Sequence, residues 1–108
     1  MTKRCVVGIG TPKKAKLALS ESDAPTVWLP SMASLAAVLS ADNRALLRTI
    51  QSKNPRSLTE LAELTGRKVP NLSRTLRTMA GYGLVTLRKD KAEVRTTVLA
   101  TEFTVILD

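Results

Sequence analysis

The sequence predicts an α+β fold in which a run of helices is followed by a β-hairpin. Between residues 31 and 80, apolar residues recur every three or four positions, which is the period of an amphipathic helix. Between residues 84 and 99 the period falls to two, as expected for strands. Short apolar runs at residues 3–9 and 26–29 predict additional strands ahead of the helices, because Val and Ile favour extended backbone.

The central helices are bounded by residues that start or stop helices. The expected ranges are 31–39, 42–53, 58–65 and 68–80. Asn54-Pro55 ends the second range, because the residue before a proline disfavours helical backbone. Ser57 and Glu60 have the spacing of a capping box at the start of the third helix, and Gly66 ends it.

The remaining segments predict a hairpin and peripheral strands. Residues 84–88 and 93–99 flank a polar turn, and a last strand is expected at 102–107. A short helix is expected at 13–20, after Pro12. We therefore divide the chain into an N-terminal extension of strand and helix that packs on the domain (1–40), a core domain (41–98) and a C-terminal strand (99–108).

The strands outside the core domain are too short to be stable alone, so we expect them to pair in a second small sheet. This sheet is a candidate dimer interface. Trp28 lies within it, and two interpretations remain open: contact with a second copy, or packing within one chain.

The composition argues against several classes of protein. The chain has 108 residues, which is the length of a single domain, and 44% of its residues are hydrophobic. There is no histidine and one cysteine, which excludes Cys/His zinc sites and histidine-based catalytic groups. Cys5 lies in an apolar run and is expected to be a buried strand residue. With no internal disulfide possible, a reducing compartment fits best.

Other motifs are too incomplete to indicate chemistry. Glu60 and Glu63 share one short helix and are expected to be solvated. The run Gly8-Ile9-Gly10 lacks the third glycine of a dinucleotide loop. No apolar stretch approaches the length of a membrane span, and the run after the basic start is too short for a signal peptide. We expect a cytoplasmic protein that is not an enzyme, with no cofactor, no metal and no membrane partner.

The charge is concentrated in the middle of the chain. There are 17 Lys and Arg against 9 Asp and Glu, a formal net charge of +8. Residues 44–95 hold 12 of the basic and 4 of the acidic side chains, and so carry the whole excess. Such a concentration of positive charge attracts polyanions, chiefly nucleic acid or an anionic membrane surface. A merely solubilising surface is the alternative.

The most informative segment is a pair of helices separated by Gly66-Arg67. A short glycine-containing turn of this kind is typical of a helix-turn-helix motif. At 100° per residue, the core face of the second helix falls within an arc of roughly 80°, and its members are Val69, Leu72, Leu76 and Met79. No acidic residue lies between Thr65 and Val85.

The opposite side of this second helix suits the major groove of DNA. Its candidate DNA-binding residues are Arg67, Lys68, Pro70, Asn71, Ser73, Arg74, Arg77 and Thr78. Asn71 and Arg74 are nominated to read bases, since asparagine pairs with adenine and arginine with guanine. Arg77 is nominated for phosphate, and Ser73 lies at the edge of the arc. The alternative is a solvated face, but such faces usually mix both signs of charge.

Two further groups of residues are candidates for phosphate contacts. The first surrounds the hairpin tip and consists of Arg88, Lys89, Lys91 and Arg95, against Asp90 and Glu93. The alternative is that these side chains only keep an exposed tip soluble. The second is Ser57 and Thr59, where hydroxyls and backbone N–H groups can hold a phosphate, with helix capping alone as the simpler role.

The stretch SLTELAELTGRKVPNLSRTLRTMAGYGLV, followed by a hairpin, resembles the winged helix-turn-helix regulators of the MarR/ArsR type. The resemblance covers residues 41–98. It implies that the second helix reads DNA, that the hairpin is the wing, and that GLV leads into the wing's first strand. The run NLSRTLR then places Asn71, Ser73, Arg74 and Arg77 on the DNA side.

The chain is shorter than typical MarR proteins, and strands precede its helices. In this it is similar to small predicted regulators, some of which look like DNA-binding antitoxins of the TumA type. We therefore expect a sequence-specific regulator of double-stranded DNA, a repressor acting as a homodimer. The alternative is a protein-interaction module, such as an antitoxin that binds a toxin and autoregulates its operon. RNA binding is disfavoured, because the chain has only three aromatic residues for stacking.

Overall fold

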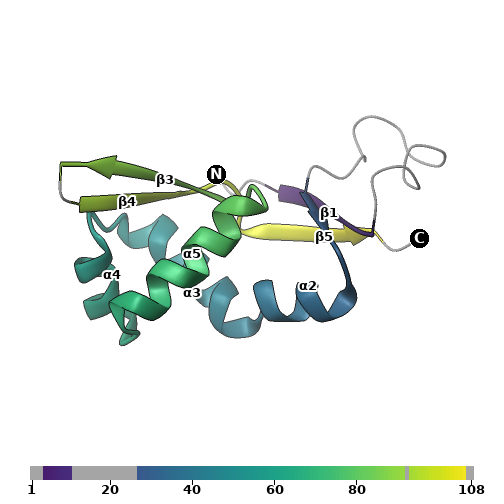
Figure 1. The fold of residues 1–108 in the computed structure, drawn as a ribbon, viewed down its shortest axis with the longest axis horizontal. Helices are drawn as coiled ribbons and strands as arrows, with labels where there is room; N and C mark the ends of the chain where they lie inside the picture. The colour runs from purple at the N-terminus through teal and green to yellow at the C-terminus, as the bar shows by residue number, and fades with distance from the viewer. Residues whose placement is uncertain (1–3, 11–26, 92, 107–108) are drawn as a thin grey trace.

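A computed structural model of the protein describes residues 4–10, 27–91 and 93–106 (Figure 1). Within these ranges the chain is a small α+β fold with four helices and two sheets. In chain order the elements are β1 (Arg4–Ile9), β2 (Val27–Leu29), α2 (Met32–Val38), α3 (Ala41–Lys53), α4 (Leu58–Thr65), α5 (Val69–Gly81), β3 (Val85–Asp90), β4 (Glu93–Val98) and β5 (Glu102–Ile106). The expected α+β class is confirmed, and each expected element in these ranges is found within two residues of its predicted bounds. The helix expected at 13–20 lies outside the described residues.

Side-chain caps explain where the helices begin. Ser31, Ser40 and Ser57 precede α2, α3 and α4, and each side-chain oxygen accepts a hydrogen bond from the backbone N–H three residues later. The expected cap by Ser57 is thus confirmed. At the other end of α4, Gly66 has a φ of 75°, a left-handed conformation that glycine adopts without steric cost.

The three peripheral strands form one parallel sheet in the order β2-β1-β5. Val7 of β1 lies between Val27 of β2 and Val105 of β5. The expectation of a second small sheet is therefore confirmed. The other sheet is the antiparallel hairpin β3-β4. The hairpin lies at one end of the molecule's 44 Å long axis and the three-stranded sheet lies towards the other (Figure 1).

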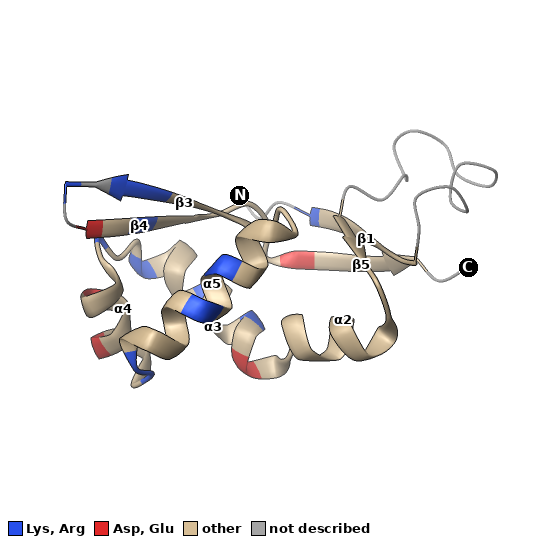
Figure 2. Cartoon of the chain, viewed as in Figure 1, with Lys and Arg blue, Asp and Glu red and all other residues tan. Residues whose placement is uncertain are grey.

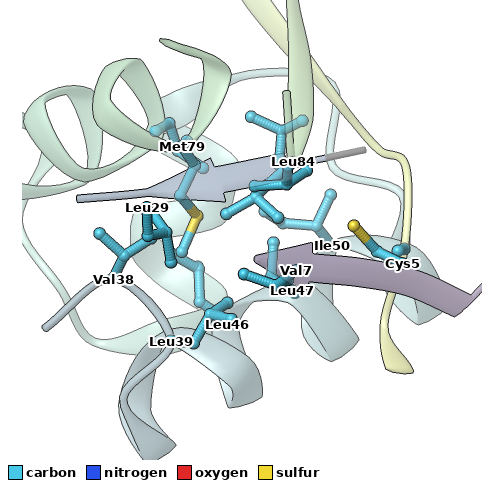
Figure 3. Close-up of a cluster of buried hydrophobic side chains, with 14 of the residues drawn as sticks. Cys5, Val7, Leu29, Val38, Leu39, Leu46, Leu47, Ile50, Met79 and Leu84 are labelled. Atoms are coloured by element: carbon cyan, nitrogen blue, oxygen red, sulfur yellow. The ribbon is translucent and has the colours of Figure 1, made fainter. Parts of the chain in front are cut away.

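One cluster of buried side chains joins both sheets to the helices (Figure 3). Val7 and Leu29 of the parallel sheet and Leu47 of α3 are each 0% exposed, as are Leu72 and Leu76 of α5. Cys5 also belongs to this cluster, which confirms the expectation of a buried strand residue. The shared core holds the hairpin, α5 and the parallel sheet in a defined relationship.

Trp28 packs within one chain, across the parallel sheet from Gly8. A Cβ added to Gly8 would lie 2.6 Å from Cζ3 of the indole, so glycine is required for this close approach. The structure shows this packing within one chain, and contact of Trp28 with a second copy stays a prediction. None of the helices in the described ranges is long and apolar enough to cross a membrane.

Candidate nucleic-acid interface

The buried side of α5 consists of Leu72, Leu76 and Met79, each at most 1% exposed. These three expectations are confirmed, but Val69, expected beside them, is 37% exposed, and its assignment to the core was wrong. Val69 is the first residue of α5 and lines a recess beside Ser57 and Val94. The core side of the helix begins only one turn later.

The opposite side of α5 is solvent-exposed and basic. Its exposed members are Lys68, immediately before the helix, and Pro70, Asn71, Arg74, Arg77 and Thr78 within it. The basic residues of α5, coloured blue in Figure 2, are arginines, and the helix carries no Asp or Glu. No salt bridge within the described ranges engages Arg74 or Arg77. The hydroxyl of Thr78 donates to the carbonyl oxygen of Arg74, so it is partly engaged within the helix.

Arg67 differs from the other predicted residues, because its guanidinium is only partly exposed and is bound by neighbouring side chains. Nε donates to Oδ1 of Asn71 over 2.8 Å, Nη1 to Oδ1 of Asn43 over 3.1 Å, and Nη2 to Oγ1 of Thr75 over 3.1 Å. Three donors of one planar fork thus connect the turn before α5 to α3 and to two positions of α5. The structure gives Arg67 a positioning role for this helix.

Asn43 extends the same network and was not predicted. Its Nδ2 donates to the carbonyl oxygens of Ala37 and Val38 at the end of α2, over 3.2 and 3.0 Å. Its Oδ1 accepts from Arg67. One amide therefore ties the end of α2 and the start of α3 to the turn between α4 and α5. No signal in the sequence connects positions 43 and 67, which are far apart along the chain.

Two recesses lie between the helices α4 and α5 and the hairpin. The smaller, of ≈ 180 Å³, is lined by Leu58, Ser73, Leu76, Arg77, Leu87, Lys89 and Val94. The larger, of ≈ 490 Å³, is lined by Ser57, Leu58, Thr59, Val69, Glu93 and Val94. The structure therefore brings together five of the predicted residues from three parts of the chain, namely Ser57, Thr59, Ser73, Arg77 and Lys89.

The basic residues of the hairpin divide between its two faces. Lys89 lies on the face towards the helices, with Leu87 two positions before it in the strand. Arg88 and Arg95 are paired directly across the hairpin and therefore share the opposite face. Both are exposed, as is Lys91 in the turn, which has a φ of 58°. Like charges facing each other repel, so this pair favours an anion between or beside them.

The family comparison covers this whole arrangement. The chain matches the HVO_A0114 family over residues 38–105, which runs from the end of α2 through the hairpin and most of β5. No curated protein matches the chain. No solved structure matches it either. Because the match spans more than half of its residues, the chain belongs to the HVO_A0114 family.

Proposed function

We propose that the protein is a sequence-specific regulator of transcription that binds double-stranded DNA through a winged helix-turn-helix, as a repressor and a homodimer. The observation that carries the proposal is the exposed side of α5, which presents Asn71, Arg74 and Arg77 without an acidic neighbour on the helix. The order of elements supports it: three helices, α3 to α5, lead directly into a basic hairpin.

In this proposal, α5 enters the major groove, which is wide enough to admit a helix. Arg74 donates two hydrogen bonds to a guanine edge. Asn71 uses Nδ2, because its Oδ1 already accepts a bond from Arg67. An Nδ2 donor is suited to the N7 acceptor of a purine.

The surroundings of α5 supply contacts to the DNA backbone. Arg77 and Lys89 line the recess beside the hairpin, and Thr59 lies at the exposed start of α4. The unpaired N–H groups at the start of a helix and the nearby cations both favour phosphate. Such contacts position the protein on DNA without reading its sequence.

A homodimer places two copies of α5 in successive major grooves, about 34 Å apart on one side of the duplex. The hairpin and the three-stranded sheet lie at different ends of the molecule, so the sheet is left available for the contact between copies. Static light scattering at micromolar concentration tests this part. A monomer throughout that range contradicts the homodimer.

DNA binding is tested by selecting duplexes from a random pool and measuring their affinity by fluorescence anisotropy. We expect a selected duplex to bind at least about 10³-fold more tightly than a scrambled one. The charge-matched control for a variant of α5 such as Arg74→Ala is Arg4→Ala. This change removes an exposed arginine from β1, outside α5 and the hairpin. Failure to bind any duplex, even at low salt where phosphate contacts are strongest, overturns the proposal.

A further inference from the structure

A second surface lies beside β5 and includes none of the residues assigned to DNA. A cleft of ≈ 270 Å³ is bounded by the end of α2, by α3 and by β5. Within the described part of the chain β5 is an edge strand, because in the order β2-β1-β5 it pairs only with β1. The groove that α3 forms with α5 is lined by other residues of α3, including Asp42, Ala45 and Thr49.

The walls of the cleft are apolar. Leu35 and Leu39 come from the end of α2, and Phe103 and Val105 come from one face of β5. Leu39 belongs to the buried core, and Leu35 and Phe103 pack against it. Val105 is 37% exposed, so an apolar wall is open to water here. Covering it with an apolar group is favourable.

Two arginines stand at the rim of these walls. Arg44 and Arg48 line the cleft from α3, four residues apart and thus on one face of the helix. Both are exposed, and no salt bridge within the described ranges engages either. Among the residues that the structure describes, no acidic one lines the cleft. The rim is therefore positive and the walls are apolar.

The remaining lining residue is a threonine, Thr101. Oγ1 of Thr101 is inaccessible to solvent and has no hydrogen-bond partner within the described part of the chain. Buried hydroxyls are nearly always paired, because an unpaired one loses its bonds to water and receives none in return. Thr101 lies in the short connection between the hairpin and β5.

We propose that this cleft binds a small organic carboxylate with an apolar body, of the size of benzoate or octanoate. The carboxylate pairs with Arg44 and Arg48, since guanidinium groups bind carboxylates through two parallel hydrogen bonds. The apolar body covers Phe103 and Val105. The volume is slightly below the roughly 300–1,000 Å³ typical of sites for drug-sized ligands, so the ligand is small.

Calorimetric titration of the full chain tests the chemistry of the ligand. The probes are benzoate and octanoate, each compared with its uncharged alcohol (benzyl alcohol, octanol), and with acetate and inorganic phosphate as anions without an apolar body. We expect saturable binding of benzoate or octanoate, at least about tenfold tighter than any of the comparison compounds. Equal binding of the alcohols, equal binding of phosphate, or no saturable binding of either carboxylate overturns the proposal.

Charge-matched variants test the location. We expect the double variant Arg44→Gln with Arg48→Gln to weaken carboxylate binding at least about tenfold. This corresponds to a loss of about 1.4 kcal/mol of binding free energy. The control is Lys53→Gln with Arg56→Gln, which removes two exposed charges that do not line the cleft. Equal affinity of the two double variants overturns the assignment.

Thr101→Val separates a binding role from a structural one. Valine removes the unpartnered hydroxyl and keeps the shape, so we expect the ligand-free protein to melt at the same or a higher temperature. The affinity for the carboxylate is expected to stay unchanged, because the hydroxyl is inaccessible and the carboxylate pairs with the arginines. A lower affinity in a folded variant contradicts the assignment of the carboxylate to Arg44 and Arg48 alone. These readouts do not involve DNA, so their outcome is independent of the proposed DNA binding.

Discussion

Nε of Arg67 donates a hydrogen bond to Oδ1 of Asn71 over 2.8 Å, which joins the turn between α4 and α5 to the first turn of α5. Through Asn43 the same guanidinium also reaches α3. Asn71 is thus held in place by protein contacts before any ligand arrives. A side chain that is fixed in advance loses less conformational entropy on binding.

The first prediction concerns this network. Arg67→Ala removes three side-chain hydrogen bonds that join the turn before α5 to α3 and to α5, and we expect it to lower the free energy of unfolding by about 1–3 kcal/mol. Urea denaturation followed by circular dichroism measures the change. The neighbouring exposed Lys68→Ala is the control and is expected to stay within about 0.5 kcal/mol of the parent. Equal effects of the two substitutions argue against the network.

The second prediction concerns the reading of bases. Arg74→Ala is expected to cost about 1–3 kcal/mol on a selected duplex and much less on random DNA, if Arg74 bonds a base edge. Arg77→Ala, a change of equal charge one turn later, is expected to weaken both duplexes alike. Anisotropy titrations of the two variants on both duplexes distinguish the roles. A uniform loss for Arg74→Ala assigns it to phosphate instead.

The third prediction concerns the hairpin. Each phosphate contact contributes about 0.9 to the slope of log Kobs against log salt concentration. Replacing both Lys89 and Lys91 by glutamine is therefore expected to reduce the magnitude of that slope by about 1.8, with little change in preference among sequences. Titrations at four or more salt concentrations measure the slope. An unchanged slope places the hairpin tip away from DNA.

The fourth prediction contrasts two glycines. Gly8→Ala forces a methyl group to within 2.6 Å of the Trp28 ring and is expected to destabilise the protein by about 1–3 kcal/mol. Gly81, at the end of α5, has open space around it, and Gly81→Ala is expected to stabilise by about 0.4–1 kcal/mol. Thermal unfolding measured by Trp28 fluorescence compares them. Equal stability of the Gly8 variant and the parent contradicts the close approach.

The fifth prediction tests the corrected core of α5. Leu76→Ala is expected to cost about 2–5 kcal/mol, because Leu76 is fully buried. Val69→Ala is expected to remain within about 0.5 kcal/mol of the parent, since its side chain is 37% exposed. Chemical denaturation of both variants gives the comparison. Truncating a buried aliphatic side chain usually lowers the free energy of unfolding by about 2–5 kcal/mol. A decrease above about 2 kcal/mol for Val69→Ala would therefore show that Val69 belongs to the core.

The helices were predictable because their signals are local. Ser57 and Gly66 bound α4 by interactions with its own backbone, and both lie within one turn of its ends. The buried positions Leu72 and Leu76 follow from spacing within α5 alone. Local rules of this kind do not depend on the rest of the fold.

The errors and omissions have a common physical cause, which is dependence on distant parts of the chain. A helical wheel assigns Arg67 a direction, but α5 begins at Val69, so helical geometry does not apply to Arg67. Its contact with Asn43 depends on how α3 packs beside the turn. The pairing order β2-β1-β5 and the cleft between Arg44 and Thr101 likewise depend on tertiary packing, which no spacing in the sequence reveals.

The register of β1 beside β5 has a consequence for how the chain folds during translation. Cys5 lies next to Phe103, so β1 must wait for β5, which is synthesised long after it. At about 5–20 residues per second, a ribosome needs several seconds to deliver that partner. In that interval β1 can pair with β2, but its other edge has no strand partner, while helices such as α3 and α4 can already form from short-range contacts. The three-stranded sheet is therefore completed only after the helices and the hairpin have been synthesised.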